Sequence, residues 1–170
     1  SLCGENGAGK STLIKVLTGV HAPDGGKYLI DGQEVHLKST QEGIALGVSC
    51  VYQELSIAPQ LDVAKNLFIG NLPMKGGLVD HKTLYKRAAE ILAELDMHIS
   101  PKTPAGALSV GQQQMLEIGR ALTRNARVII MDEPTSSLSE SETETLFGVI
   151  KKLTAKNIAV VYISHKLDEV

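Results

Sequence analysis

The chain has 170 residues, of which 43% are hydrophobic and 21% charged, and its formal net charge is −2. These proportions are typical of one globular domain of α/β size, and without a run of Lys or Arg they do not indicate a nucleic-acid surface. No apolar run is long enough to cross a membrane. Cys3 and Cys50 lie in apolar, strand-like stretches without a CxxC or His partner, so we expect reduced thiols in the core.

A glycine-rich turn lies between a short strand and a helix near the beginning of the chain. Residues 1–3 read as the end of a buried strand, and apolar residues at helical spacing follow over 13–17, with Gly19 as a stop. The turn fits the pattern G-x-x-x-x-G-K-[ST] with Gly4, Glu5, Asn6, Gly7, Ala8, Gly9, Lys10 and Ser11.

This turn predicts a phosphate-binding loop. Glycines let backbone N–H groups wrap a polyphosphate, and the N-terminus of the following helix adds partial positive charge. Lys10 supplies a full charge toward the β- and γ-phosphates, Ser11 a hydroxyl for Mg²⁺, and Thr12 a second hydroxyl within reach. An ordinary glycine-rich turn before a helix is the alternative.

The segment up to residue 53 reads as a hairpin, a short helix and a buried strand. Asp31-Gly32 lies between two strand-like stretches and is a hairpin signal. Ser39 is a cap candidate for a short helix through Leu46, and an apolar strand over 47–52 ends at Gln53.

The region from about 55 to 108 lacks strand signals and reads as a mostly helical insertion. A short helix fits 62–69 and an amphipathic helix fits 80–96. Prolines and glycines break the chain at 73–77 and 100–106. We therefore expect an α-helical subdomain inserted into the fold.

Ser109 is the candidate N-cap of a helix that runs to about Asn125. This helix carries an apolar stripe formed by Met115, Leu116, Ile118, Ala121 and Leu122. A helix N-terminus that carries Ser109 and Gly111 is a second candidate anion site, and a simple capped helix is the alternative.

Two continuously apolar runs, 128–131 and 158–163, fit central strands of a parallel sheet that is covered on both faces. Residues 139–155 between them read as a helix, with Glu140 and Glu142 suited to its first turn. Strands that alternate with helices predict an α/β fold with a doubly wound, mostly parallel sheet.

Polar residues follow each predicted strand, at the sheet edge where open parallel sheets bind ligands. Asp132 stands where a phosphate-loop enzyme places the carboxylate that holds Mg²⁺, and Glu133, pointing the other way, can act as general base. Solvated loop charges are the alternative for this pair. Gln53 and His165 say little alone, because a Gln is often a polar strand terminus and a single His is more often structural. His165 could hydrogen-bond to a γ-phosphate.

Together these motifs resemble the ATP-binding cassette family, and the match covers the whole chain in order. The matched motifs are Walker A (4–11), the Q-loop (Gln53), the signature (108–112), Walker B (128–132), the catalytic glutamate (Glu133), the D-loop (136–139) and the switch histidine (His165). Val110 departs from the Gly that the family often has, and Ser139 from its usual Asp. Residues 52–56, 111–118, 130–138 and 162–166 further resemble ATPase subunits of bacterial monosaccharide importers.

The resemblance implies a P-loop NTPase that hydrolyses ATP to energise monosaccharide uptake, such as that of ribose or a related pentose or hexose. It implies ATP and Mg²⁺ as cofactors, and a peripheral location on the cytoplasmic side of the bacterial inner membrane. The implied partners are a second cassette, in the same polypeptide or a dimer, integral membrane permease subunits and, through the complex, a periplasmic or extracellular sugar-binding protein. No nucleic-acid partner is implied.

The same resemblance assigns roles to residues. The phosphates lie against residues 4–12, and Mg²⁺ is held by Ser11, Gln53 and Asp132. The implied catalytic residues are Glu133, His165 and Gln53. The residues that meet the γ-phosphate of the partner cassette are Ser109, Gly111 and Gln112.

Two rival functions fit the sequence less well. Chromosome-type cassette proteins need a very long insertion between Walker A and the signature, which the spacing excludes, and ribosome-acting members read Asn-His-Leu-Asp at the position of 136–139. A non-hydrolysing regulatory module is opposed by the intact Lys10, Asp132, Glu133 and His165.

The chain begins three residues before the glycine-rich turn and ends at 168–170 in what reads as the beginning of a helix. We therefore expect residues 1–170 to be a single nucleotide-binding domain, truncated at both ends and internal to a longer protein. The aromatic residue that stacks on adenine in the family would lie upstream.

Overall fold

The computed structural model describes residues 1–4 and 8–166. The predicted site residues Glu5, Asn6 and Gly7, and the helix expected to begin at 168–170, lie outside the described residues. At the centre is a four-stranded sheet in the order β1-β8-β7-β4, in which every neighbouring pair is parallel. Its strands are β1 (Leu2–Cys3), β4 (Val48–Val51), β7 (Val128–Asp132) and β8 (Ala159–Ser164).

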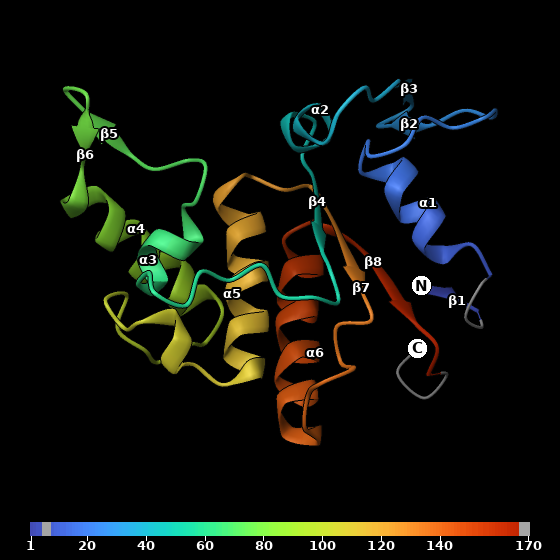
Figure 1. Ribbon diagram of the computed structural model, residues 1–170. Helices are drawn as coiled ribbons and strands as arrows, with labels where there is room; N and C mark the ends of the chain where they lie inside the picture. The colour runs from blue at the N-terminus through green and yellow to red at the C-terminus, as the bar shows by residue number, and fades with distance from the viewer. Residues whose placement is uncertain (5–7, 167–170) are drawn as a thin grey trace.

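Helices cover both faces of this sheet. Helix α1 (Lys10–Leu17) lies on one face, whereas α5 (Val110–Thr123) and α6 (Glu140–Ala155) lie on the other (Figure 1). Along β7, Ile130 packs with Ile14 of α1, while Ile129 and Met131 belong to the core formed with α5 and α6. Because successive side chains of a strand point to opposite faces, both sets are buried, which explains the continuously apolar run. The predicted parallel α/β architecture is confirmed.

A separate antiparallel hairpin precedes strand β4 of the parallel sheet. Strands β2 (Leu29–Ile30) and β3 (Gln33–Glu34) pair around Asp31 and Gly32, whose φ angles are 51° and 77°. Two consecutive positive φ values are the requirement of a type I′ turn, so the Asp-Gly signal predicted the hairpin correctly. Helix α2 (Thr40–Ala45) follows, and Ser39 caps it by accepting a hydrogen bond from the Glu42 N–H.

The segment between β4 and α5 lies beyond α5, on the side away from the sheet (Figure 1). It contains α3 (Val63–Leu67), α4 (His81–Glu94) and a 3₁₀ turn η1 (Ala105–Ala107). Gly119 of α5 lets these helices approach closely, because a Cβ there would lie 2.6 Å from a Leu67 methyl group and 3.0 Å from one of Leu95.

This segment, expected to be mostly helical, also contains a short hairpin that the sequence did not signal. Strands β5 (Met74–Lys75) and β6 (Leu78–Val79) form a hairpin around Gly76 and Gly77, both with positive φ. Each strand has two residues, which is too short for an alternating pattern to be recognised in the sequence.

The expectation that both thiols lie in the core is wrong for Cys3. Strand β1 lies at an edge of the described sheet and Cys3 is exposed there, whereas Cys50 on β4 is half-buried. Burial, reinforced by the charge of Asp132, raises the pKa of the Cys50 thiol to about 12. Within residues 1–4 and 8–166, no helix combines the length and apolar character that a bilayer crossing requires.

Candidate functional site

The carboxyl ends of the four parallel strands meet at one edge of the sheet, which brings the predicted site residues together. The register pairs Asp132 at the end of β7 with Ile163 on β8. The Glu133 N–H then donates to the Ile163 carbonyl at 2.9 Å. His165 follows two residues later, so the two carboxylates and the imidazole lie beside each other because of strand pairing.

A cavity of about 350 Å³ opens at this edge. Each of its lining residues was predicted from the sequence: Gly9, Lys10, Ser11, Thr12, Gln53, Asp132 and Glu133. These residues come from segments that are far apart in the chain, and the lining is mostly polar. Of the other predicted phosphate-loop residues in the described part, Ala8 directly precedes the lining and Gly4 contacts it through Lys10.

The N-terminus of α1, which follows the glycine-rich turn, has features that suit an anion. Gly9 caps α1 with a left-handed φ of 88°, which favours glycine. Helix α1 has no acidic residue in its first turn and no side-chain cap, so its own side chains do not neutralise the partial positive charge of its N-terminus. The Lys10 ammonium donates to the Gly4 carbonyl at 2.5 Å.

Asp132 and Glu133 occupy different environments within the cavity. Burial raises the pKa of Asp132, the neighbouring Glu133 charge raises it further, and Lys10 opposes both effects. Glu133 adopts a φ of 45°, which is unusual for a residue with a side chain and turns its carboxylate away from the strand direction. Its Oε1 lies 3.1 Å from His165 Nδ1, and the Glu133 side chain is 17% exposed.

The donor set of this cavity fits a magnesium ion. Ser11, Gln53 and Asp132 offer a hydroxyl, an amide oxygen and a carboxylate, which are the oxygen ligands that Mg²⁺ prefers. In the part of the chain that the structure describes, no cluster of three or more His, Cys, Asp or Glu residues could hold a metal. Proteins usually bind Mg²⁺ through one or two carboxylates together with substrate phosphates, and this cavity supplies the carboxylate of Asp132.

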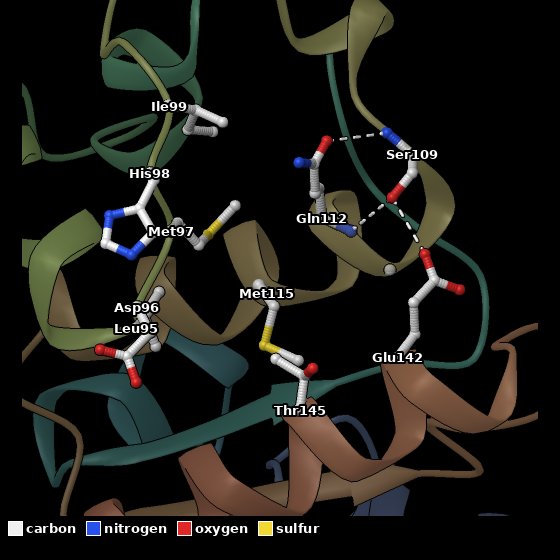
Figure 2. A pocket seen from close by; sticks show the side chains of 11 residues that line it. Leu95, Asp96, Met97, His98, Ile99, Ser109, Gln112, Met115, Glu142 and Thr145 are labelled. Atoms are coloured by element: carbon white, nitrogen blue, oxygen red, sulfur yellow. Dashed lines mark hydrogen bonds between the residues drawn. The ribbon is translucent and has the colours of Figure 1, made fainter.

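The predicted second anion site lies elsewhere. Ser109 and Gln112 form a capping box at the N-terminus of α5, in which each side chain accepts the backbone N–H of the other. These residues and Gly111 line a separate cavity of about 400 Å³, whose other walls come from residues 95–99, which follow α4, from Met115 of α5 and from α6 (Figure 2). Among the described residues, its lining shares none with the cavity at the sheet edge, so Ser109 and Gly111 line a different cavity from Gly9, Lys10 and Ser11.

Two interactions near these sites were not predicted from the sequence. Ser109 Oγ donates to Glu142 Oε1 of α6 at 3.0 Å (Figure 2). Near Gln53, Ser56 is held by two buried residues of α5: its N–H donates to Glu117, and its carbonyl accepts from Arg120. The sequence contains a signal for the second interaction, since Glu117 and Arg120 are oppositely charged residues at i, i+3 spacing among the apolar residues of α5.

Sequence comparison finds related proteins over the whole chain. The model of the ABC transporter family matches residues 1–136. The arabinose import ATP-binding protein AraG of Azospirillum brasilense is 50% identical over 169 residues, which cover 99% of this chain and 32% of that protein. The galactose/methyl galactoside import ATP-binding protein MglA of Haemophilus influenzae is 48% identical over 170 residues, covering 100% of this chain and 34% of that protein. The chain thus spans about a third of the length of these curated relatives.

Solved structures share the fold. A nucleotide-free ATP-binding cassette from an ABC transporter matches with a TM-score of 0.86 at 31% identity, covering 99% of this chain and 70% of that chain. A dimeric post-hydrolysis state of the cassette MJ0796, bound to ADP and Pi, matches with a TM-score of 0.77 at 26% identity, covering 98% and 74%. The parallel sheet with helices on both faces is therefore the fold of these cassettes.

Proposed function

Because this chain belongs to the ABC transporter family, we propose that it binds ATP and hydrolyses it to drive the import of a monosaccharide. The observation that carries this proposal is the cavity at the carboxyl edge of the sheet, where the glycine-rich turn, Gln53, Asp132 and Glu133 converge. The relatives named for arabinose and galactose import support a sugar as the transported substrate.

In this proposal the glycine-rich turn and α1 hold the phosphates. The backbone N–H groups at the N-terminus of α1 carry partial positive charge, and the first turn of this helix contains no acidic residue. Lys10 would exchange its bond with the Gly4 carbonyl for the β- and γ-phosphates. Ser11, Gln53 and Asp132 would hold Mg²⁺, which when bound neutralises charge between those phosphates.

Glu133 is the proposed general base. Its carboxylate is largely shielded from solvent at the edge of the cavity, where it can accept a proton from a water molecule that attacks the γ-phosphate. His165 Nδ1 lies 3.1 Å from the carboxylate. In this proposal His165 would orient Glu133 through Nδ1, and Nε2 of its ring would face the γ-phosphate. Asp132, whose raised pKa reflects burial and a like charge, would become a better anion once a cation lies beside it.

The α5 N-terminus suggests that a second cassette completes each site. Ser109 and Gly111 lie in a cavity away from the glycine-rich turn of the same chain, so we propose that they meet the γ-phosphate held by an opposing cassette. The dimer of the related cassette MJ0796 is consistent with such an arrangement. Closure of the two cassettes would drive integral membrane permease subunits, contacted by the segment between β4 and α5, with a sugar-binding protein delivering the substrate.

Phosphate release by the full-length protein that contains this chain tests the proposal. We expect Mg²⁺-dependent release of phosphate from ATP. Lys10→Ala should weaken ATP binding by about tenfold or more, as expected for loss of a charge-assisted contact of roughly 1.5–3 kcal/mol. Lys15→Ala removes the same charge from the exposed last turn of α1 and serves as the matched control. Unchanged ATP affinity in Lys10→Ala would contradict the phosphate-loop assignment.

A further inference from the structure

Glu142 of α6 reaches across to the N-terminus of α5 and occupies its anion-binding groups. Its Oε1 accepts the Ser109 hydroxyl proton at 3.0 Å (Figure 2). A Cβ added to Gly111 would lie 2.5 Å from the same oxygen, so the carboxylate packs directly against the Gly111 backbone. The carboxylate therefore fills the space in which a phosphate oxygen bound to Ser109 and Gly111 would lie.

The hydrogen bonds of Ser109 leave no proton for a second acceptor. A serine hydroxyl has one proton to donate, and Ser109 donates it to Glu142 while its oxygen accepts the Gln112 N–H at 3.2 Å. Glu142 is held in the ionised form, since hydrogen bonds from the Ser139 N–H, the Ser109 hydroxyl and the Ser139 hydroxyl lower its pKa. Two anions cannot share one hydroxyl proton in this space.

We propose that Glu142 is a positioning residue that holds Ser109 in the free cassette and must release it before the γ-phosphate of an opposing nucleotide can bind. This inference rests on the proposed function, because it assumes that Ser109 and Gly111 meet a nucleotide. It adds a residue that lies outside the segments that the sequence singled out for phosphate binding.

The second oxygen of Glu142 gives the carboxylate another anchor. Oε2 accepts the Ser139 N–H at 3.1 Å and the Ser139 hydroxyl at 3.0 Å, within the first turn of α6. Release of Ser109 therefore costs one exposed hydrogen bond and leaves the capping box of α6 intact. A phosphate oxygen replaces the lost acceptor, so the exchange is favourable only when nucleotide is presented from the opposite side.

Removal of Glu142 should change the ATP requirement in one direction if Glu142 holds Ser109, and in the opposite direction if its role is merely structural. Removing Glu142 frees the Ser109 proton, so less ATP is needed to close the two cassettes. Loss of one exposed hydroxyl–carboxylate bond should lower the half-saturating ATP concentration by roughly three- to tenfold. If Glu142 only supported the two helix N-termini, its removal would raise that concentration or lower kcat.

The test is an ATP titration of phosphate release by the full-length protein and its Glu142→Ala, Glu142→Gln and Glu140→Gln variants. We expect Glu142→Ala to lower the half-saturating ATP concentration with kcat within about twofold of the unsubstituted protein. Glu142→Gln keeps the shape and the acceptor oxygen but loses the charge, so its half-saturating ATP concentration should lie between those of Glu142→Ala and the unsubstituted protein. Glu140→Gln removes the same charge from the same turn, where Glu140 is exposed and does not bond to Ser109, and should change neither parameter.

Several outcomes would overturn the inference. An unchanged or raised half-saturating ATP concentration in both Glu142 variants, or an equal decrease in Glu140→Gln, would contradict the release of Ser109 by Glu142. Glu142→Gln is nearly isosteric and keeps the test valid if Glu142→Ala does not fold. Absence of phosphate release by the unsubstituted protein would instead overturn the proposed function, and the inference with it.

Discussion

Replacement of Glu117 by alanine should destabilise the protein strongly, because this carboxylate belongs to a buried ion pair. Glu117 and Arg120 of α5 are each 8% exposed. Glu117 accepts the Ser56 N–H at 2.9 Å, and Arg120 donates to the Ser56 carbonyl and to the Asn66 carbonyl, both at 3.1 Å. The pair thus fixes the segment that follows Gln53 against α5.

The magnitude follows from the charge that is left behind. Removing one partner of a buried ion pair costs about 3–5 kcal/mol, since the other charge stays buried without compensation. Arg120 keeps its hydrogen bonds to the Ser56 and Asn66 carbonyls, so we expect the lower end of this range for Glu117→Ala. Glu117→Gln keeps an acceptor for the Ser56 N–H but also leaves the buried Arg120 charge without its partner, so it should cost about 2–3 kcal/mol, slightly less than Glu117→Ala. For a domain of this size, about 3 kcal/mol corresponds to a decrease of about 6–12 °C in Tm.

Calorimetry of the full-length protein measures this effect. Glu144→Ala removes an exposed glutamate from α6 and is the control, with an expected change in Tm of less than about 2 °C. A Glu117→Ala protein that unfolds within about 2 °C of the unsubstituted protein would refute the assignment of a buried, stabilising pair.

Three further predictions concern stability and reactivity. Burial raises the pKa of Asp62, but hydrogen bonds and a lysine charge outweigh this effect, so the pKa is lowered overall. The contribution of Asp62 to stability should therefore be lost as the pH falls through that lowered pKa. Asp62→Asn should make acid unfolding less dependent on pH over this range. Gly119→Ala should cost about 1–3 kcal/mol by overpacking against leucine side chains, whereas Gly148→Ala in α6, which meets no atom within 4 Å, should be neutral or stabilising in thermal unfolding. A maleimide near neutral pH should label the exposed Cys3 much faster than Cys50, whose thiol has a pKa of about 12; equal rates in the folded protein would contradict this.

Features encoded by neighbouring residues could be predicted from the sequence. The sequence predicted helix N-termini at Ser39, Ser109 and Ser139. Each of these serines caps its helix in the structure. The convergence of Gln53 and Asp132 on one cavity also followed from local patterns, because parallel strands end at one edge whatever their exact order.

Features that depend on packing between distant segments could not be predicted. Ser109 and Glu142 are 33 residues apart, and Ser56 and Glu117 are 61 apart, so no periodicity or spacing rule connects them. Their pairing results from how α5 packs against α6 and against the segment after β4. The exposure of Cys3 was missed for a related reason, since an apolar context does not reveal how far other segments cover a strand: β1 and β4 both lie at edges of the sheet, yet Cys3 is exposed and Cys50 is half-buried.

Single-turnover phosphate release by the Glu133→Gln variant of the full-length protein tests the central claim most directly. Glutamine keeps the volume of Glu133 and a contact to His165 Nδ1, but it cannot accept a proton from water. We expect ATP affinity to stay within about threefold, because Lys10 and Asp132 are untouched, and the rate of phosphate release to fall by about 10²–10⁴-fold. A variant that binds ATP and hydrolyses it at the rate of the unsubstituted protein would contradict the assignment of Glu133 as general base.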